Sequence, residues 1–421
     1  MGDTSARMTR HTRRVPGLTP AHAGCLVAAV LAVASVAAAQ DASTVSLDAA
    51  VAAARRQAPA VAAAALRATA ARTSAEAVPY LGNPSLEARI ENWGGGDRDD
   101  LTKDVFLVAT QPIELAGRAG RRRAVAAADA AAAEAHHREV ARAASLAVVR
   151  SYVDAVRVRD EVALLEDQAA RLTRAVTTMR ARVTEGVSAE GDLKRLESEH
   201  TRLAIALQRR LAERDLHTAT LGLLIGRPVQ ASQLVTPVPT PPPTTAHDDV
   251  IEQHPAVATA RLRAAAADAL VAFEDAQRFP LLLVSGGYKR TSGVSTGVAA
   301  LGLTLPVFDR SQSPRARARG EAAASHLEYE AARAAVRTEI AAQRAIAERL
   351  AAAATNLEAL LLEPARIARD AAYAAVLEGS ADVVKLVDAD RAYADARLDA
   401  LSLLADAVVA QRRLALMIGL E

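Results

Sequence analysis

Cysteine is almost absent from this sequence. The single cysteine, Cys25, lies in an N-terminal segment with the pattern of a secretory signal: basic residues up to Arg14, an apolar run and the triplet Ala37-Ala38-Ala39. We therefore expect residues 1–39 to be a signal peptide. Most of the apolar run follows Cys25, so lipidation is not expected. The rest of the chain has no thiol, which excludes disulfides, thiolate metal sites and a cysteine nucleophile.

Aromatic residues make up only 3% of the 421 residues, although 51% are hydrophobic and alanine supplies much of that fraction. Small side chains cannot fill a thick core, but they let helices lie close together. Alanine mixed with Arg, Glu, Asp and Leu is typical of long helices. The net charge of +2 does not favour a nucleic-acid partner. After the signal no run reaches about 18 uninterrupted apolar residues, so a membrane-spanning helix is not expected.

Glycine and proline are missing from two long stretches. Between Gly120 and Gly186 there is neither, and between Glu321 and Gly379 there is only Pro364. At a rise of 1.5 Å per residue, an unbroken stretch of this length forms a rod of roughly 100 Å. We expect Pro364 to kink the second rod, because it lacks the N–H that a helix needs.

The chain contains two copies of one arrangement. Residues 59–68 (PAVAAAALRA) match residues 255–264 (PAVATARLRA), and the copies end alike at Gly226 and Gly419. This predicts a signal peptide at 1–39, repeat 1 at 40–226, a Pro-rich linker at 227–248 and repeat 2 at 249–421. In each repeat a helix, a strand pair, a long helix, a tight tip and a return helix follow one another.

Apolar and polar residues alternate ahead of each rod. Leu86, Ala88 and Ile90 alternate with charged residues, which predicts a strand with one apolar and one wet face. The strand pairs are expected at about 85–111, closed by Pro112, and at about 281–305, with a loop over 291–296. Four strands cannot close a barrel, and an open sheet has unpaired edges in a bilayer. Either several chains share one barrel, or a small sheet caps a helical bundle.

The sequence contains no motif typical of a catalytic or cofactor-binding site. The chain lacks a Gly-rich phosphate loop, a nucleophile elbow and a metal-ligand cluster. Glu134/His137 and Glu197/His200 both have the Glu-x-x-His spacing of di-iron bundles. Their heights above the first tip differ by about 50 Å, so they cannot share a metal. We therefore expect no catalytic residue, no cofactor and no bound metal: the chain is a conduit and not an enzyme.

The arrangement resembles the TolC-like outer membrane factors, the outer membrane efflux protein family. In that family a glycine tip is followed by an acid, and here Gly186 is followed by Asp192 and Gly379 by Asp388. The run 111–118 (QPIELAGR) is similar to the CzcC-like cation-efflux branch. The resemblance covers essentially the whole chain after the signal.

This resemblance implies a mostly α fold with a small β part, assembled as a homotrimer. Twelve strands would form a barrel in the outer membrane of a Gram-negative bacterium, and twelve helices a periplasmic α-barrel. The partners would be a periplasmic adaptor, an inner-membrane pump of the RND type and outer-membrane lipid, with no nucleic acid. The function would be the exit duct of a tripartite efflux system, for heavy-metal cations more than drugs. A type I protein secretion duct and a periplasmic coiled-coil adaptor or scaffold are the alternatives.

The resemblance also assigns the tips and the helices behind them. Adaptor docking falls on Gly186, Val187, Ser188, Gly379 and Ser380, which could equally be plain hairpin turns with Gly at positive φ and Ser as a helix cap. A periplasmic constriction falls on Asp192, Lys385 and Asp388, although an acid near a helix N-terminus also suits the macrodipole. Relatives latch the closed tip where this chain has Val376 and Ala381, so that latch is missing here.

Arginines begin both rods, just past the strands. They are Arg118, Arg121, Arg122, Arg123, Arg315 and Arg317, followed by Arg319. Cations at a helix N-terminus oppose its dipole, so a compensating partner is expected. Anionic lipid headgroups at the membrane interface are one candidate, and a solvated surface is the other interpretation.

Overall fold

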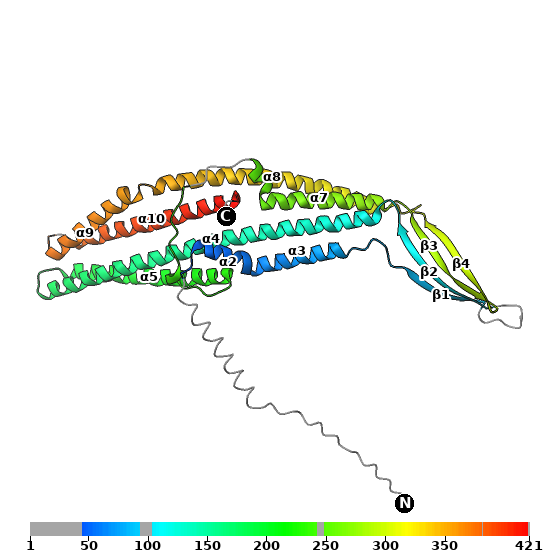
Figure 1. The fold of residues 1–421 in the computed structure, drawn as a ribbon. Helices are drawn as coiled ribbons and strands as arrows, with labels where there is room; N and C mark the ends of the chain where they lie inside the picture. Colours follow the sequence, from blue (N-terminus) through cyan, green and yellow to red (C-terminus); the bar gives the residue numbers. More distant parts are fainter. Residues whose placement is uncertain (1–43, 93–102, 242–247, 381, 420–421) are drawn as a thin grey trace, which may run out of the picture. The chain divides into compact units, whose positions relative to one another are not determined.

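The computed structural model describes residues 44–92, 103–241, 248–380 and 382–419 (Figure 1). The signal peptide, the loop around Trp93 and the latch position Ala381 lie outside these residues. The prediction of a mostly helical chain with a small sheet is confirmed. No helix in the described part of the chain combines the length and hydropathy needed to cross a membrane.

Both repeats contain the expected series of elements. The first comprises α2 (Leu47–Gln57), α3 (Pro59–Ala77), β1 (Ser85–Glu91), β2 (Asp104–Glu114), α4 (Arg118–Thr184) and α5 (Glu190–Ile225). The second comprises α6 (Asp248–Gln253), α7 (Pro255–Ala276), β3 (Leu281–Thr291), β4 (Val294–Thr304), α8 (Gln312–Ala354), α9 (Glu363–Glu378) and α10 (Val383–Met417). Both α3 and α7 start with proline at the first helical position, where its missing N–H costs nothing.

The first rod is continuous and the second is interrupted. Helix α4 runs for 67 residues, beginning after Gly117 and ending before Gly186, both at positive φ. On the other rod, α8 ends at Ala354, and a π-helical turn, η2 (Glu358–Leu362), precedes α9. Pro364 lies in the first turn of α9, so the ladder of helical hydrogen bonds breaks just before it (Figure 1).

One antiparallel sheet joins the repeats in the order β1-β2-β3-β4 (Figure 1). Pro112 was expected to end the second strand, but β2 continues to Glu114 and pairs Pro112 with Leu283. Beyond Thr110, β2 has no pairing with β1 and is an edge, where proline is tolerated. The expected loop over 291–296 is also wrong: Ser292 (φ 47°) and Gly293 (φ 87°) form a two-residue turn with the positive φ values of type I′.

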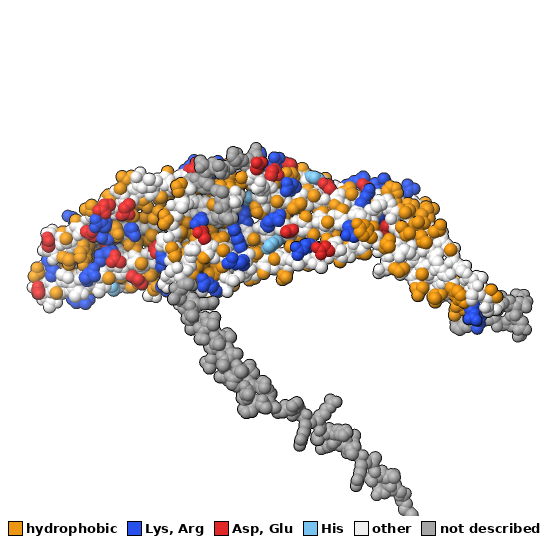
Figure 2. Space-filling model, in the orientation of Figure 1, with side chains coloured by type: hydrophobic (Ala, Val, Ile, Leu, Met, Phe, Trp, Pro, Cys, Tyr) orange, Lys and Arg blue, Asp and Glu red, His pale blue; other side chains and the backbone are white. Residues whose placement is uncertain are grey.

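The sheet has one apolar and one mixed face. Register places Leu86, Leu107, Tyr288, Val284 and Leu301 on the same side, and it pairs Arg89, Phe106, Lys289 and Thr296 on the other. Much of the apolar face is exposed, with Leu301 at 77%. Figure 2 shows hydrophobic side chains gathered over the strands. A single chain therefore leaves this face, and the outer edges of β1 and β4, uncovered.

Buried contacts fix the linker after repeat 1. It begins with a 3₁₀ turn over Ala231–Gln233. The hydroxyl of Tyr152 on α4, a fully buried residue, donates to the Val235 carbonyl (2.8 Å) and accepts from the Val235 N–H (2.9 Å). Thr240 N–H donates to the Gln411 side chain of α10 (2.8 Å). The described part of the linker is therefore bound to both repeats.

Two adjacent glycines of β3 test the close pairing at the centre of the sheet. A methyl group on Gly287 would lie 2.8 Å from the Val108 Cα and closer still to the Leu107 carbonyl oxygen, whereas one on Gly286 would meet nothing within 4 Å. We expect Gly287→Ala to destabilise the chain by about 1–3 kcal/mol through overpacking. Gly286→Ala should change it by less than about 0.5 kcal/mol. Thermal unfolding of both variants in detergent measures the difference, and equal effects would contradict the register.

Candidate functional site: the hairpin tips

The first tip is the turn between α4 and α5. Gly186 has φ 72°, and the Val187 N–H donates to the Arg182 carbonyl (2.9 Å), which closes the end of α4. Val187 is 64% exposed. Ser188 was offered as a helix cap, but the cap residue of α5 is Ala189 and no side-chain hydrogen bond is made there. The tip therefore presents an apolar side chain on a rigid turn.

The second tip, between α9 and α10, uses its serine differently. Gly379 has φ 80°. The Ser380 N–H and hydroxyl both donate to the Ala375 carbonyl, at 2.9 and 3.1 Å, so Ser380 ends α9 and does not cap α10. Asp382 is the cap instead, because its carboxylate accepts from the Val384 N–H (2.9 Å). The serine cap expected at this tip is therefore wrong.

Arg182 connects the two tips. It is the basic residue in the last turn of α4, and its guanidinium donates to the Val376 carbonyl of α9 (3.2 Å). It also lies over Gly379, where a methyl group would clash with it. The Val376 side chain is buried in a cluster with Met179, Val383 and other apolar residues of both hairpins. These contacts join the two tips of this chain. The sequence feature that could have identified Arg182 is its position in the last turn of the predicted long helix, where a basic residue suits the helix dipole.

The three residues proposed for a constriction are not brought together within one chain. Asp192 is half-buried in the first turn of α5, where an acid suits the helix dipole. Lys385 and Asp388 are exposed near the start of α10. No ion pair or hydrogen bond links any two of them in the described part of the chain.

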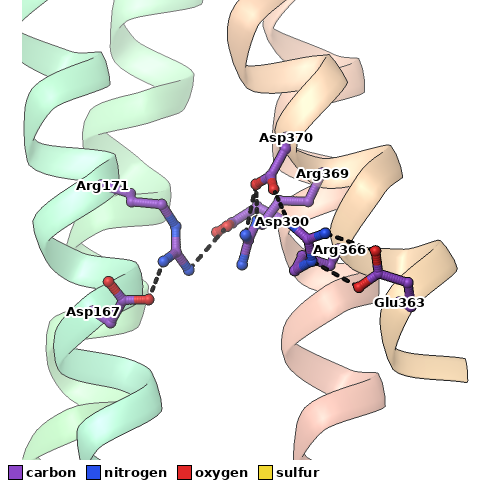
Figure 3. Close-up of polar contacts among 7 residues, drawn as sticks. All are labelled: Asp167, Arg171, Glu363, Arg366, Arg369, Asp370 and Asp390. Carbon is purple, nitrogen blue, oxygen red and sulfur yellow. Dashed lines mark hydrogen bonds and ion pairs between the residues drawn. The ribbon is translucent and has the colours of Figure 1, made fainter. Parts of the chain in front are cut away.

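A neighbouring acid, Asp390, is buried between the hairpins. It is 9% exposed, and the Gln168 amide of α4 donates to its Oδ2 atom (2.6 Å). Arg171 Nη2 lies 3.8 Å from Oδ1 (Figure 3). Burial raises the pKa of Asp390 above its ordinary value, although Gln168 and Arg171 act in the opposite direction. Sequence reasoning missed Asp390, but its spacing of four and seven from the buried Leu386 and Val383 marks the inner face of α10.

Close to Asp390, a second polar contact connects the two hairpins. Glu199 of α5 accepts from Arg391 Nε of α10 (3.0 Å) and from Arg202 Nη2 of its own helix (2.8 Å). The hydrogen bond from Arg391 is the main reason that the pKa of the Glu199 carboxyl is lowered. Two charged or polar contacts thus hold α10 against α4 and α5.

The facing surface of α9 carries further ion pairs, drawn in Figure 3. Arg369 pairs with Asp370 (2.6 Å), and its guanidinium also lies 3.9 Å from the centre of the Tyr393 ring of α10. Arg366 pairs with Glu363 (2.7 Å). The ion pairs lie within α9, and the cation–π contact of Arg369 with Tyr393 connects α9 to α10 beside Asp390.

Most of the proposed interface arginines find partners inside the chain. Arg118 donates to the Gln277 carbonyl (2.8 Å) at the C-terminal end of α7, and Arg121 to the Ala272 carbonyl (2.9 Å). The C-terminal carbonyls of α7 therefore supply the compensation that lipid headgroups were expected to give.

Three of the other arginines at the rod starts also contact a residue of the same chain. Arg122 contacts Glu114 (2.5 Å), Arg123 lies over the Tyr80 ring (4.1 Å), and Arg315 pairs with Asp275 (2.7 Å). Arg317 is exposed.

The two Glu-x-x-His pairs lie on different helices, Glu134 and His137 on α4 and Glu197 and His200 on α5. His200 Nε2 is 3.1 Å from the Thr173 hydroxyl. Within the described ranges no three His, Asp or Glu side chains come together as metal ligands.

Replacing Asp390 by asparagine tests whether the buried charge destabilises the fold. A carboxyl whose pKa rises on folding stabilises the fold while protonated, and this contribution is lost as the pH rises through the raised pKa. We expect Asp390→Asn, which keeps an acceptor for Gln168, to raise the unfolding temperature at pH 7.5 by roughly 2–4 °C. The gain should shrink as the pH falls through the ordinary pKa of an aspartate, about 3.9, and vanish near pH 3, where the wild-type carboxyl is protonated in both states. The exposed Asp388→Asn is the matched control and should change little; a gain that persists at pH 3 would contradict the assignment.

Comparison with known proteins agrees with this architecture. The family model described as outer membrane efflux protein matches residues 246–420, which span the second repeat. The cobalt-zinc-cadmium resistance protein CzcC of Cupriavidus metallidurans is 26% identical over 329 residues, which is 76% of this chain and 77% of that protein.

Solved channel structures share the fold. The outer membrane protein VceC of Vibrio cholerae superposes with a TM-score of 0.74 at 18% identity, over 89% of this chain and 96% of VceC. The transmembrane channel CusC superposes with a TM-score of 0.74 at 17% identity, over 88% and 91%. An efflux channel is a conduit, so the expectation that the chain is not an enzyme is confirmed by its family match. Residues 246–420 of this chain thus match the outer membrane efflux protein family model, and the chain shares the fold of the solved channels CusC and VceC.

Proposed function

We propose that this chain forms the outer-membrane exit duct of a tripartite efflux system in a Gram-negative bacterium. The observation that carries the proposal is the sheet: among the described residues it has an exposed apolar face, a mixed opposite face that carries charged side chains, and two unpaired edges. In a bilayer every backbone group needs a partner, so such a sheet is complete only when several chains close a barrel around a wet lumen.

A homotrimer meets this demand. Three copies of four strands give twelve, and the edge of β1 in one chain then pairs with the edge of β4 in the next. The two helical hairpins of each chain would form the periplasmic tunnel in the same assembly. Their alanine-rich surfaces suit this packing, since small side chains let neighbouring helices lie close together. Arg317, exposed just past β4, is the arginine left to contact lipid headgroups.

We assign heavy-metal cations as the cargo, delivered by an inner-membrane pump of the RND type through a periplasmic adaptor. The relative from Cupriavidus metallidurans is named for resistance to cobalt, zinc and cadmium. Asp192 and Asp388, repeated threefold, would favour cations at the tunnel entrance. A type I protein secretion duct is the alternative cargo class. A periplasmic adaptor or scaffold is disfavoured, because adaptors carry one hairpin between β-rich domains and this chain has two hairpins and no such domain among its described residues.

A deletion strain tests the cargo. Cells lacking this chain should become sensitive to cobalt, zinc and cadmium salts, and plasmid-borne wild type should restore growth. The same strain is challenged with dyes and antibiotics, and its outer membrane is fractionated for a trimer that dissociates on heating. Sensitivity to drugs alone would overturn the metal assignment. A monomer confined to the periplasm would overturn the duct itself.

The first tip offers a point test of adaptor docking. Val187 is exposed and makes no part of the buried cluster, so Val187→Asp should leave the trimer and its amount in the membrane unchanged. A buried charge without a partner is costly at an interface. We expect Val187→Asp to reduce metal resistance at least tenfold in plating assays and to abolish cross-linking to the adaptor.

Val187→Ala, which keeps the tip apolar, is the matched control and should retain resistance. Full resistance of the Val187→Asp strain at normal trimer levels would exclude this tip from docking.

A further inference from the structure

Four helices lie side by side near the sheet, in the order α3, α4, α7 and α8 (Figure 1). Helix α7 is packed on both sides, by α4 and by α8, whereas α3 and α8 are the outer members of this layer. Repetition relates the helices in pairs, because α3 corresponds to α7 and α4 to α8. The contact between α4 and α7 therefore has a counterpart that a single chain cannot make, between α8 and the α3 of a second copy.

The outer face of α3 is apolar and uncovered. The prolines that begin α3 and α7 are 196 residues apart (255 − 59). On α7, Leu262 is partly buried and Ala266 is buried, on the side opposite Asp268, which contacts α8. Their counterparts on α3, Leu66 and Ala70, are exposed, Leu66 at 71%. The same positions are thus covered in the helix with two neighbours and exposed in the helix at the edge.

Helix α8 exposes a leucine on its own outer face. Ser325 is buried, and Leu327, two residues on, lies on the opposite side of the helix and is 73% exposed. The residues that share its row along α8 are small and exposed as well: Gly320, Ala324 and Ala331. Two outer faces in the layer, one on α3 and one on α8, therefore each present a single large apolar side chain among small ones.

The contact inside the chain fixes the register of the missing one. Arg121, near the start of α4, donates to the Ala272 carbonyl near the end of α7 (2.9 Å). Arg142, further along α4, and His254, just ahead of α7, line one cavity. Helices α4 and α7 are therefore antiparallel. The residues that precede α4 and α8 both have positive φ and are 194 residues apart (311 − 117).

Both offsets can be applied to the contact between the start of α4 and the end of α7. They place Arg315 of the next chain beside Glu76 of α3. Leu66 lies ten residues before Glu76, and Leu327 lies twelve residues after Arg315. Because the helices are antiparallel, the two leucines then differ in height by about 3 Å, which is two residues at a rise of 1.5 Å. The two exposed leucines thus fall opposite each other.

Charges agree with this register. Within the chain, Asp275 is shared by Arg315 (2.7 Å) and Arg319 (3.2 Å), so one carboxylate faces two guanidinium groups. Glu76 is exposed in the last turn of α3, which contains no basic residue to suit the negative end of the helix dipole. An arginine from the next chain would pair with this acid and also stabilise the end of α3.

We propose that Leu66 of one chain packs against Leu327 of the next, and that this pair anchors the helical part of the interface between subunits. The inference rests on the homotrimer proposed above. Inside the chain the counterpart of Leu327 is Ala133, so the contact between chains is formed by larger side chains than its internal copy. Their neighbours Ala70 and Ala324 are small. Burial free energy scales with apolar area, so the two leucines stabilise the assembly more than the residues around them.

Cysteine cross-linking tests the pair. The one cysteine of the sequence, Cys25, lies in the predicted signal peptide, so the exported chain offers no competing thiol. A disulfide needs Cβ atoms about 3.5–4.5 Å apart. We expect the double variant Leu66→Cys/Leu327→Cys, oxidised in outer-membrane preparations, to give a covalent trimer that reductant dissolves. Each single variant should stay monomeric on a denaturing gel. Leu66→Cys/Ala341→Cys is the matched control, because Ala341 is exposed on the same helix about 21 Å further along, and it should not cross-link.

A double-mutant cycle gives a second measurement without cysteine. Leu66→Ala and Leu327→Ala should each lower the temperature at which the trimer dissociates, and the two together should lower it by less than the sum, because one contact is lost in either case. Strictly additive shifts would overturn the pairing. A wild-type trimer in which the double cysteine variant gives no cross-link would also overturn it, while leaving the exit duct intact. A wild-type chain that is monomeric would instead overturn the duct.

Discussion

Packing along α4 is the constraint on which the rest of the structure depends. Helices α2, α3 and α5 of its own repeat, and α7 and α10 of the other, all pack against it. Alanine-rich helices bury little area each, so a rod of this length is stable only when neighbours cover it on several sides. Tyr152, one of the fully buried residues of α4, also binds the linker, and the linker binds Gln411 of α10, so the second repeat is held to the first.

Much of the fold could be predicted because its signals are local. Glycines at positive φ end the rods, Pro364 interrupts the second rod, and period-two alternation marks the strands. The wrong predictions concern residues whose conformation depends on how the strands pair. Pro112 fits a strand only because β1 has already ended, and Ser292 accepts positive φ only because the turn must match two long strands.

The positions of the hairpin tips could be predicted from the sequence, but the roles of the side chains around them could not. Both tips fall at the expected glycines, yet the serines there do not cap the return helices. Resemblance to relatives drew attention to Asp388, while Asp390, two residues on, faces the other hairpin. Arg118 and Arg121 illustrate the same limit, because they donate to carbonyls at the C-terminal end of α7, some 150 residues away in sequence. Long-range partners leave no local pattern.

The two hairpins of one chain are mechanically unequal, although they arise from one repeated arrangement. Hairpin 1 has an unbroken α4, whereas hairpin 2 contains η2 and Pro364, and helices bend most readily where their hydrogen-bond ladder is interrupted. The contacts between the hairpins are directional: Arg182 to the Val376 carbonyl, Gln168 to Asp390 and Arg391 to Glu199. Polar contacts of this kind have discrete arrangements, made or broken, while an apolar surface can slide. Separating the two hairpin tips would therefore require these contacts to break.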